Sequence, residues 1–180
     1  MAESIRATQI DMTVSGLVLP NGLRIHSVTL LLPSPIVHTS PWTIPEGTQV
    51  DANVVVKCSD LEDHLSERRP AGLSDFRISA EAGRLQVVAR MRTIVAVEVG
   101  AVGTLEFRQG HVDFVVERAE VAGLEAPRKV IDEIMLKVNP LIDLTGWPVD
   151  IHVRELTSGD GELRWDVRLR STAPVPRREP

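Results

Sequence analysis

Tyrosine is absent from this sequence, cysteine occurs once, and aromatic residues are scarce. With only 3% aromatic residues, the chain is poorly equipped to stack on nucleic-acid bases, and its net charge of −5 further disfavours a nucleic-acid partner. The single Cys58 excludes an internal disulfide, so the fold does not require an oxidising compartment.

Long apolar runs are also absent. No window approaches the roughly 18 apolar residues that a membrane-spanning helix needs. Residues 1–12 lack the apolar core of a signal peptide. We therefore expect a soluble chain. Its location stays open, because a cytoplasmic protein and a trimmed exported protein share these features.

Motifs for catalysis and cofactor binding are lacking as well. There is no Gly-x-Ser-x-Gly motif, no phosphate-binding loop and no GxGxxG after a strand. Cys58 is interpreted as a small core residue, because the sequence positions no base beside it. The histidines are scattered, with none at metal-ligand spacing from another: His26, His38, His64, His111 and His152. We expect no enzyme, no metal and no cofactor; an enzyme would need a polar cluster that only the folded chain assembles.

The strongest helical pattern lies between Ala126 and Pro140. Pro127 suits the first helical position, and Asn139 with Pro140 forms a stop signal. An isolated helix of this length is marginal in water, so its apolar face must pack against a sheet. At 100° per residue, that face contains Val130, Ile131, Ile134, Met135 and Val138.

Most of the remaining chain alternates between apolar and polar residues, which is typical of strands. The clearest runs are 9–15, 50–58, 84–92 and 163–170, and a capping box predicts a second, short helix over 59–68. Short turns between consecutive strands indicate antiparallel pairing. We predict an α+β fold: a strongly curved antiparallel sheet of about eight or nine strands wrapped around one main helix, 127–139. Residues 1–170 form a single domain, and residues 171–180 a disordered tail.

Two surface features leave alternatives open. Arginines on alternate strand positions, such as Arg84, Arg90 and Arg92, form a basic outer face that is either simply solvated or in contact with anionic lipid headgroups. The segment 33–47 contains four prolines and cannot be a central strand. It is either an ordered loop over the core or a tip that touches a membrane or covers a pocket mouth. The apolar residues of this tip are Ile36, Val37, Trp42 and Ile44.

Apolar, glycine and proline residues recur as landmarks through the second half of the chain. They are Leu65, 72–78 (GLSDFRI), 83–87 (GRLQV), 121–127 (VAGLEAP), 138–144 (VNPLIDL) and 147–149 (WPV). These landmarks resemble the LmeA-like phospholipid-binding family of actinobacteria and related bacteria, and the similarity covers residues 10–169 and is clearest after Leu61. The resemblance implies a tubular lipid-binding (TULIP-like) architecture, in which a curved sheet wraps a long helix and acyl chains lie between them. Many members carry an N-terminal signal or anchor, which this chain does not show.

Two hypotheses for function follow. In the first, the protein binds a lipid or another long apolar ligand, with possible transient contact with a membrane surface and a role in envelope lipid transfer or homeostasis. In the second, it is a packed scaffold or interaction domain with no small ligand, and the volume of its interior discriminates between the two. The candidate lipid-binding residues are those of the helix face, Val130, Ile131, Ile134, Met135 and Val138, and the facing strand positions Leu85, Val87, Ala89, Trp165, Val167 and Leu169.

Overall fold

The structure is a computed structural model that describes residues 4–6, 9–33, 36–39, 42–43, 49–92, 96–145 and 149–171. Within these ranges it contains two α-helices, one short 3-10 helix and strands that pair antiparallel throughout. The predicted α+β class with mostly antiparallel sheet is therefore confirmed.

Nine of the described strands have nine or more residues, and five are shorter. The long ones are β2 (Gln9–Val18), β3 (Arg24–Pro33), β6 (Gln49–Lys57), β7 (Leu73–Glu81), β8 (Arg84–Arg92), β9 (Ala96–Arg108), β10 (His111–Val121), β13 (Val149–Gly159) and β14 (Glu162–Ser171). The short ones are β1 (Ser4–Arg6), β4 (Ile36–Thr39), β5 (Trp42–Thr43), β11 (Leu124–Glu125) and β12 (Ile142–Asp143). The helices are α1 (Cys58–Arg68), η1 (Pro70–Gly72) and α2 (Arg128–Val138).

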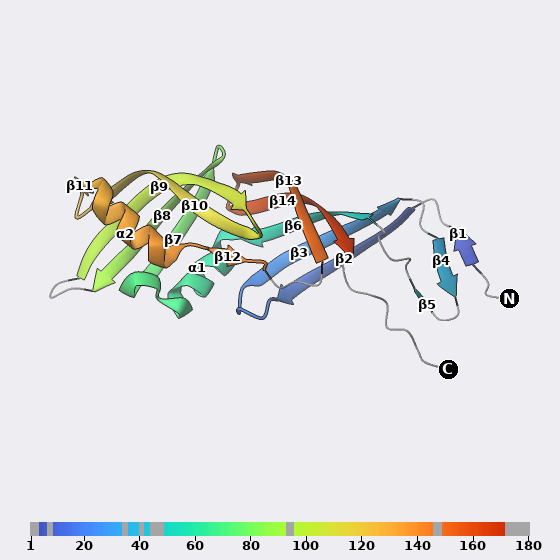
Figure 1. The fold of residues 1–180 in the computed structure, drawn as a ribbon. Helices are drawn as coiled ribbons and strands as arrows, with labels where there is room; N and C mark the ends of the chain where they lie inside the picture. The colour runs from blue at the N-terminus through green and yellow to red at the C-terminus, as the bar shows by residue number, and fades with distance from the viewer. Residues whose placement is uncertain are drawn as a thin grey trace.

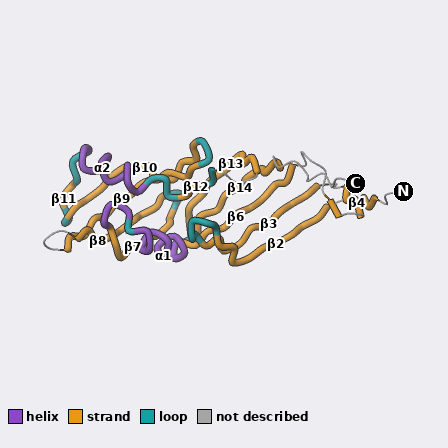
Figure 2. Tube along the Cα trace, turned by 60° about the horizontal axis from the view of Figure 1, so that its bottom comes forward, coloured by secondary structure: helices purple, strands orange, loops and turns teal. Residues whose placement is uncertain are grey.

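The strands form two large sheets and one small one. A six-stranded sheet has the order β11-β10-β9-β8-β7, with β12 also paired to β10, and a five-stranded sheet has the order β13-β14-β6-β3-β2. Figures 1 and 2 show an elongated molecule with the six-stranded sheet at one end, the five-stranded sheet beside it, and the small β1-β4-β5 sheet beyond.

The two large sheets join at their turns. The Gly83 N–H at the β7–β8 turn donates to the Ser158 carbonyl of β13 at 2.9 Å. The Gly161 N–H at the β13–β14 turn donates to the Ala80 carbonyl of β7 at 3.3 Å. The most deeply buried side chains come from both sheets and α1, so the core is continuous across this junction. They include Val56, Leu61, Leu65, Leu85 and Leu163, each at most 1% exposed.

Helix α1 forms over nearly the predicted residues but starts differently. Its N-cap is Lys57, and no side chain caps it. The predicted capping box is wrong because the Glu62 carboxylate instead accepts a hydrogen bond from the Ile78 N–H of β7. Helix α1 packs against β7, β3 and β6, so it bridges the two large sheets.

Helix α2 spans Arg128–Val138 and ends at Asn139, as the stop signal predicted. The residues that flank it are hydrogen-bonded to β10, between the short pairings of β10 with β11 and with β12. The Ala126 N–H donates to the Ala119 carbonyl at 2.9 Å, and the Asn139 side-chain amide exchanges hydrogen bonds of 3.0 and 3.1 Å with the Phe114 backbone. The helix therefore lies beside β10, where the residues that flank it satisfy backbone groups that would otherwise be open, and it also contacts η1, which leads into β7 on the other side of the sheet. The prediction that one sheet wraps around this helix is not confirmed.

Candidate functional site

An apolar cavity lies on the inner face of the five-stranded sheet. Its volume is about 230 Å³, and every residue that lines it is apolar. They are Val14, Leu17, Leu19, Ile25, Val28, Leu30, Val54, Leu144, Ile151, Trp165, Val167 and Leu169.

The wall of this cavity follows from strand register. Val14 of β2 is paired with Val28 of β3, Val28 with Val54 of β6, and Val54 with Trp165 of β14. Because side chains alternate across a strand, residues paired in this way lie in one row on one face. Four strands thus contribute one continuous apolar row.

The opposite face of the same sheet is polar. The Asn53 side-chain amide donates to the Asp166 carboxylate at 2.8 Å, and the Arg168 guanidinium donates to Asp51 at 2.9 Å. Arg154 also pairs with Asp51 at 2.9 Å, and the hydrogen bond from Arg168 is the largest cause that lowers the Asp51 pKa below its usual value. The sheet is therefore amphipathic, with charge on the outer face and apolar side chains on the inner face.

The inner face is open along strand β2. Every residue of β2 is exposed, including the groove residues Val14 and Leu17, each at 38%. Exposed apolar residues on an edge strand such as β2 are unusual in a protein that buries the apolar face of its sheet completely. The cavity is thus one part of an apolar groove whose β2 side is in contact with solvent.

Trp165 forms the buried floor of the groove. The side chain is only 3% exposed, and its indole nitrogen has no hydrogen-bond partner among the described residues. An unpartnered buried donor raises the free energy of the folded state.

Three of the predicted site residues line the groove: Trp165, Val167 and Leu169. The other predicted strand residues lie on the inner face of the six-stranded sheet instead. Leu85 and Ala89 are 0% and 3% exposed, and Val87 is half-buried against the same core. The structure therefore divides the predicted set between two sheets.

The predicted helix residues differ in burial. Val138 is 6% exposed and Val130 is 38% exposed, while Ile131 is half-buried. Ile134 and Met135 are partly buried and pack against the core. None of these five lines the groove of the five-stranded sheet.

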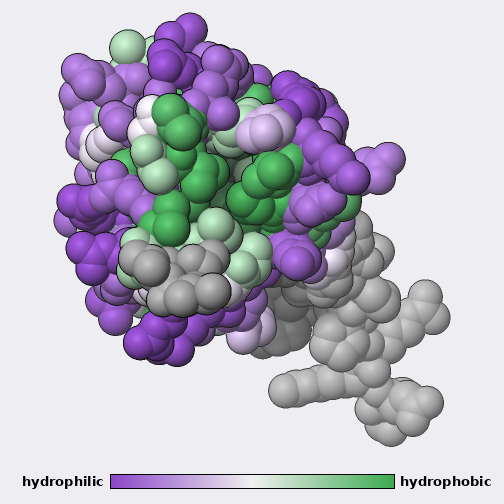
Figure 3. All heavy atoms as spheres, turned by 90° about the vertical axis from the view of Figure 1, so that its left-hand side faces the viewer, coloured by the Kyte–Doolittle hydropathy of each residue, from purple (hydrophilic) through white to green (hydrophobic). Residues whose placement is uncertain are grey.

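A second apolar hollow lies at the far end of the six-stranded sheet. Figure 3 looks onto this end and shows apolar side chains gathered in a depression with hydrophilic residues around it. The partly buried apolar residues of this half are Val87, Met91, Ala101, Leu105, Phe107, Val116, Val121, Ile134 and Met135. Among the predicted site residues, Val87, Ile134 and Met135 belong to this partly buried set, and their contact with a ligand stays a prediction.

The proposed membrane or pocket-mouth tip is described only in part. Ile36 and Val37 belong to β4 and Trp42 belongs to β5, whereas Ile44 lies outside the described residues. Contact of this tip with a membrane stays a prediction.

Sequence reasoning missed nine of the groove residues. Val14 and Val54 fall on the apolar side of the alternating runs 9–15 and 50–58, but the sequence does not indicate that these strands belong to one sheet with β14. Leu144, which follows β12, carries no periodic signal at all. The sequence identifies which residues form strands but does not indicate which strands pair with one another.

Polar chemistry is sparse in the described part of the chain. No group of three or more potential metal ligands occurs there. Burial raises the pKa of the Cys58 thiol, which disfavours the reactive thiolate, and the side chain is 4% exposed, so its predicted core position is confirmed. None of the helices in the described ranges has the length and apolar character to cross a membrane.

Comparisons with characterised proteins and with solved structures gave no match. A family model does match, from residue 5 to residue 168 of the 180. That span contains both helices, all of both large sheets except the last residues of β14, and every groove residue except Leu169. The chain belongs to the LmeA-like phospholipid-binding family.

Proposed function

We propose that the protein is a non-enzymatic lipid-binding protein that holds an acyl chain in the groove of the five-stranded sheet. The observation that carries this proposal is a cavity lined only by apolar side chains on a sheet face that is open along β2. Membership of a phospholipid-binding family supports the ligand class.

The energetics suit an aliphatic chain. Burial of each methylene group contributes roughly 0.8 kcal/mol, so about a dozen methylenes gain several kcal/mol even after the cost of ordering the ligand. The cavity of about 230 Å³ is smaller than a pocket that encloses a whole ligand, commonly ~300–1,000 Å³. A chain that lies along an open groove, with part of its surface on the protein, fits this size.

A polar headgroup and a second chain then need other surfaces. The apolar hollow beside α2 (Figure 3) supplies a further apolar surface at the other end of the molecule. Its candidate contacts include Val87 and Ile134. A role in envelope lipid transfer or homeostasis, with transient membrane contact through the tip around Trp42, is consistent with this arrangement.

A matched pair of variants on strand β3 tests the groove. Val28→Trp fills the groove. Thr29→Trp places the same side chain on the opposite, polar face of the sheet, where the Thr29 hydroxyl lies 3.2 Å from the Thr13 hydroxyl. Native mass spectrometry of the purified protein, followed by organic extraction, is expected to detect bound phospholipid or fatty acid in the wild type and in Thr29→Trp.

Loss of the bound lipid in Val28→Trp alone supports the groove. Equal lipid content in both variants overturns it. Wild-type protein that carries no lipid and takes up no added fluorescent lipid overturns the lipid-binding function as well, and favours a packed scaffold with a protein partner.

A further inference from the structure

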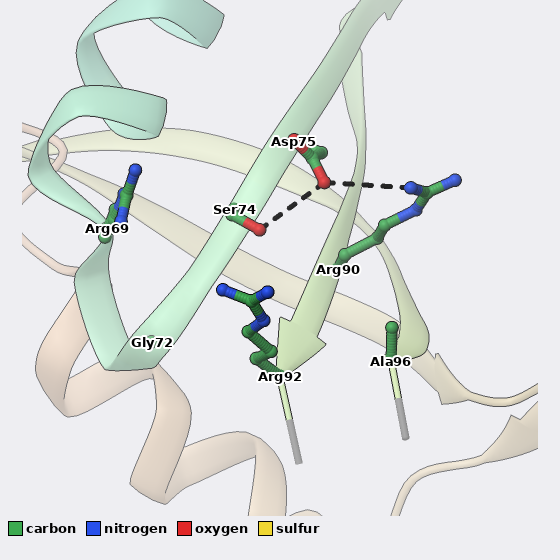
Figure 4. A pocket seen from close by; sticks show the side chains of 7 residues that line it. All are labelled: Arg69, Gly72, Ser74, Asp75, Arg90, Arg92 and Ala96. Atoms are coloured by element: carbon green, nitrogen blue, oxygen red, sulfur yellow. Dashed lines mark hydrogen bonds and ion pairs between the residues drawn. The ribbon is translucent and has the colours of Figure 1, made fainter. Parts of the chain in front are cut away.

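A cationic pocket lies where α1 and η1 lead into β7, beside the end of β8 (Figure 4). Its volume is about 390 Å³. Arg69 contributes from the end of α1, Ser74 and Asp75 from β7, and Arg90 and Arg92 from β8. In Figure 4 the Arg92 side chain extends into the space between Ser74 and η1.

Two of the three arginines form no ion pair with the part of the chain that the structure describes. Asp75 is the sole acid in the lining, and its carboxylate lies 3.8 Å from the Arg90 guanidinium. Glu98 lies opposite Arg90 on β9 but pairs with Arg77 at 3.1 Å. Arg69 and Arg92 make no ion pair within the ranges the structure describes. The pocket thus carries a net positive charge in a chain whose net charge is −5.

Two local backbone conformations direct Arg69, Ser74 and Asp75 towards the pocket. Arg69 ends α1 in the left-handed conformation, with φ 47°, and its N–H donates to the Leu65 carbonyl at 2.9 Å. Asp75 also has a positive φ, 53°, within a bulge where the β7–β8 register shifts between Ser74 and Arg77. A bulge redirects side chains, and here it places Ser74 and Asp75 at the pocket.

The pocket lies on the outer face of the six-stranded sheet, at the same end of β8 as an apolar surface on the inner face. Met91 packs against the inner core, and Arg92, the next residue, lines the pocket. Both residues lie at the C-terminal end of β8. This end of the six-stranded sheet is the one that faces the viewer in Figure 3, where the apolar hollow is seen. An apolar hollow and a cationic pocket at the same end of one sheet match an amphiphile that has an anionic head.

We propose that this pocket binds the phosphate group of an anionic lipid headgroup. The Arg69 and Arg92 guanidinium groups donate hydrogen bonds to phosphate oxygens, a geometry that suits the planar guanidinium fork. The Ser74 hydroxyl at the pocket wall donates to the Asp75 carboxylate at 3.5 Å, a long hydrogen bond that it can exchange for one to a phosphate oxygen. The proposal rests on the lipid-binding function and adds a site for the polar end of the ligand.

The test compares lipids that differ by the phosphate. Fluorescent phosphatidylglycerol and diacylglycerol with the same acyl chains are titrated into the full-length protein. The variant is Arg69→Gln with Arg92→Gln. Arg84→Gln is the matched control, because Arg84 lies on the same face of β8 and pairs with Glu117 at 3.4 Å.

The double variant is expected to bind phosphatidylglycerol about tenfold or more weakly, the effect of losing charge-assisted hydrogen bonds, with diacylglycerol binding unchanged. The control retains wild-type affinity for both lipids. Equal phosphatidylglycerol affinity in the double variant and the wild type overturns the headgroup site while leaving lipid binding intact.

A titration with glycerol 3-phosphate, followed by NMR of the arginine Nε–H signals, separates the sources of phosphate. Shifts of the Arg69 and Arg92 signals with no effect of the double variant on lipid affinity overturn the headgroup assignment and identify a site for free phosphate. If the wild type binds neither lipid, the proposed function fails. Shifts of those two signals then still support the phosphate site, and their absence overturns it.

Discussion

The two large sheets carry the same alternation of apolar and polar residues but differ in what covers them. The six-stranded sheet has one helix beside β7 and one beside β10: Glu62 of α1 accepts the Ile78 N–H of β7, and Asn139 after α2 pairs with the Phe114 backbone of β10. The five-stranded sheet ends in β2, in which every residue is exposed.

The two sheets show that the apolar character of a strand face and the packing against that face are separate properties. Alternation determines which face of a strand is apolar. Whether that face becomes solid core or an open groove depends on what packs against it. Leu85 on the inner face of β8 is 0% exposed, whereas Leu30 on the inner face of β3 is half-buried and lines the groove.

The largest expected difference is between leucine truncations in the two sheets. Leu85→Ala is expected to lower the free energy of unfolding by about 2–5 kcal/mol, because it leaves a cavity in a fully packed core. Leu30→Ala is expected to lower it by no more than about half as much, because this side chain already faces open space. Urea denaturation of delipidated protein measures both values.

Lipid affinity is expected to distinguish the same two leucine variants. Leu30→Ala is expected to weaken lipid binding, since it removes apolar area from the groove, while folded Leu85→Ala protein retains it. Equal losses of stability in the two variants would show that the groove is packed as tightly as the core, and would contradict the difference in packing between the two sheets.

A second pair of variants tests how closely the strands of the six-stranded sheet approach. A Cβ atom on Gly103 of β9 would lie 2.1 Å from the Val115 carbonyl oxygen and 3.0 Å from the Phe114 ring. Gly103→Ala therefore forces a backbone shift and is expected to cost about 1–3 kcal/mol. On the same strand, a Cβ on Gly100 meets no atom within 4 Å. Gly100→Ala is expected to be neutral or slightly stabilising. Thermal unfolding of both variants measures the difference; a destabilised Gly100→Ala would indicate that this part of the strand is also closely packed.

The sequence predicted the secondary structure well because the strands and helices have strong local signals. The alternation in β8 and β14 and the Asn139-Pro140 stop after α2 are properties of neighbouring residues. The position of α2 was not predictable from such signals. Its position beside β10 depends on contacts between Asn139 and Phe114, which are 25 residues apart.

The groove was predicted only in part for the same reason. Trp165, Val167 and Leu169 were identified by alternation within one strand. Their neighbours on β3 and β6 are joined to them by pairings such as Val54 with Trp165, more than a hundred residues apart. Leu85 and Ala89 share the same pattern but face the packed core. Periodicity cannot distinguish these cases, because both faces are equally apolar.

The smallest expected effect concerns His64, which lies where the two sheets meet. Its side chain is 3% exposed on α1, the helix that packs against both sheets, and its Nε2 has no hydrogen-bond partner in the part of the chain that the structure describes. Burial lowers the pKa of His64 below its usual 6.5, and the charge of Arg68 lowers it further, against a smaller opposing effect of Glu67. The unfolded chain therefore binds a proton at a higher pH than the folded protein does.

The stability that depends on neutral His64 is fully present above the unfolded pKa and declines as the pH falls below it towards the folded pKa. Calorimetry is expected to show a decrease of Tm between about pH 7.5 and about pH 5.5. In His64→Gln this decrease is expected to be smaller, whereas His152→Gln, at an exposed position of β13, keeps the wild-type dependence. If the loss arises at the junction, hydrogen exchange at low pH rises first in α1 and in the β2–β3 turn, where a Cβ on Gly22 would lie 4.0 Å from the His64 Nδ1. Exchange that rises first in α2 would place the pH-sensitive contact beside β10 instead. The junction between the two sheets would then be as stable as the core of the six-stranded sheet itself.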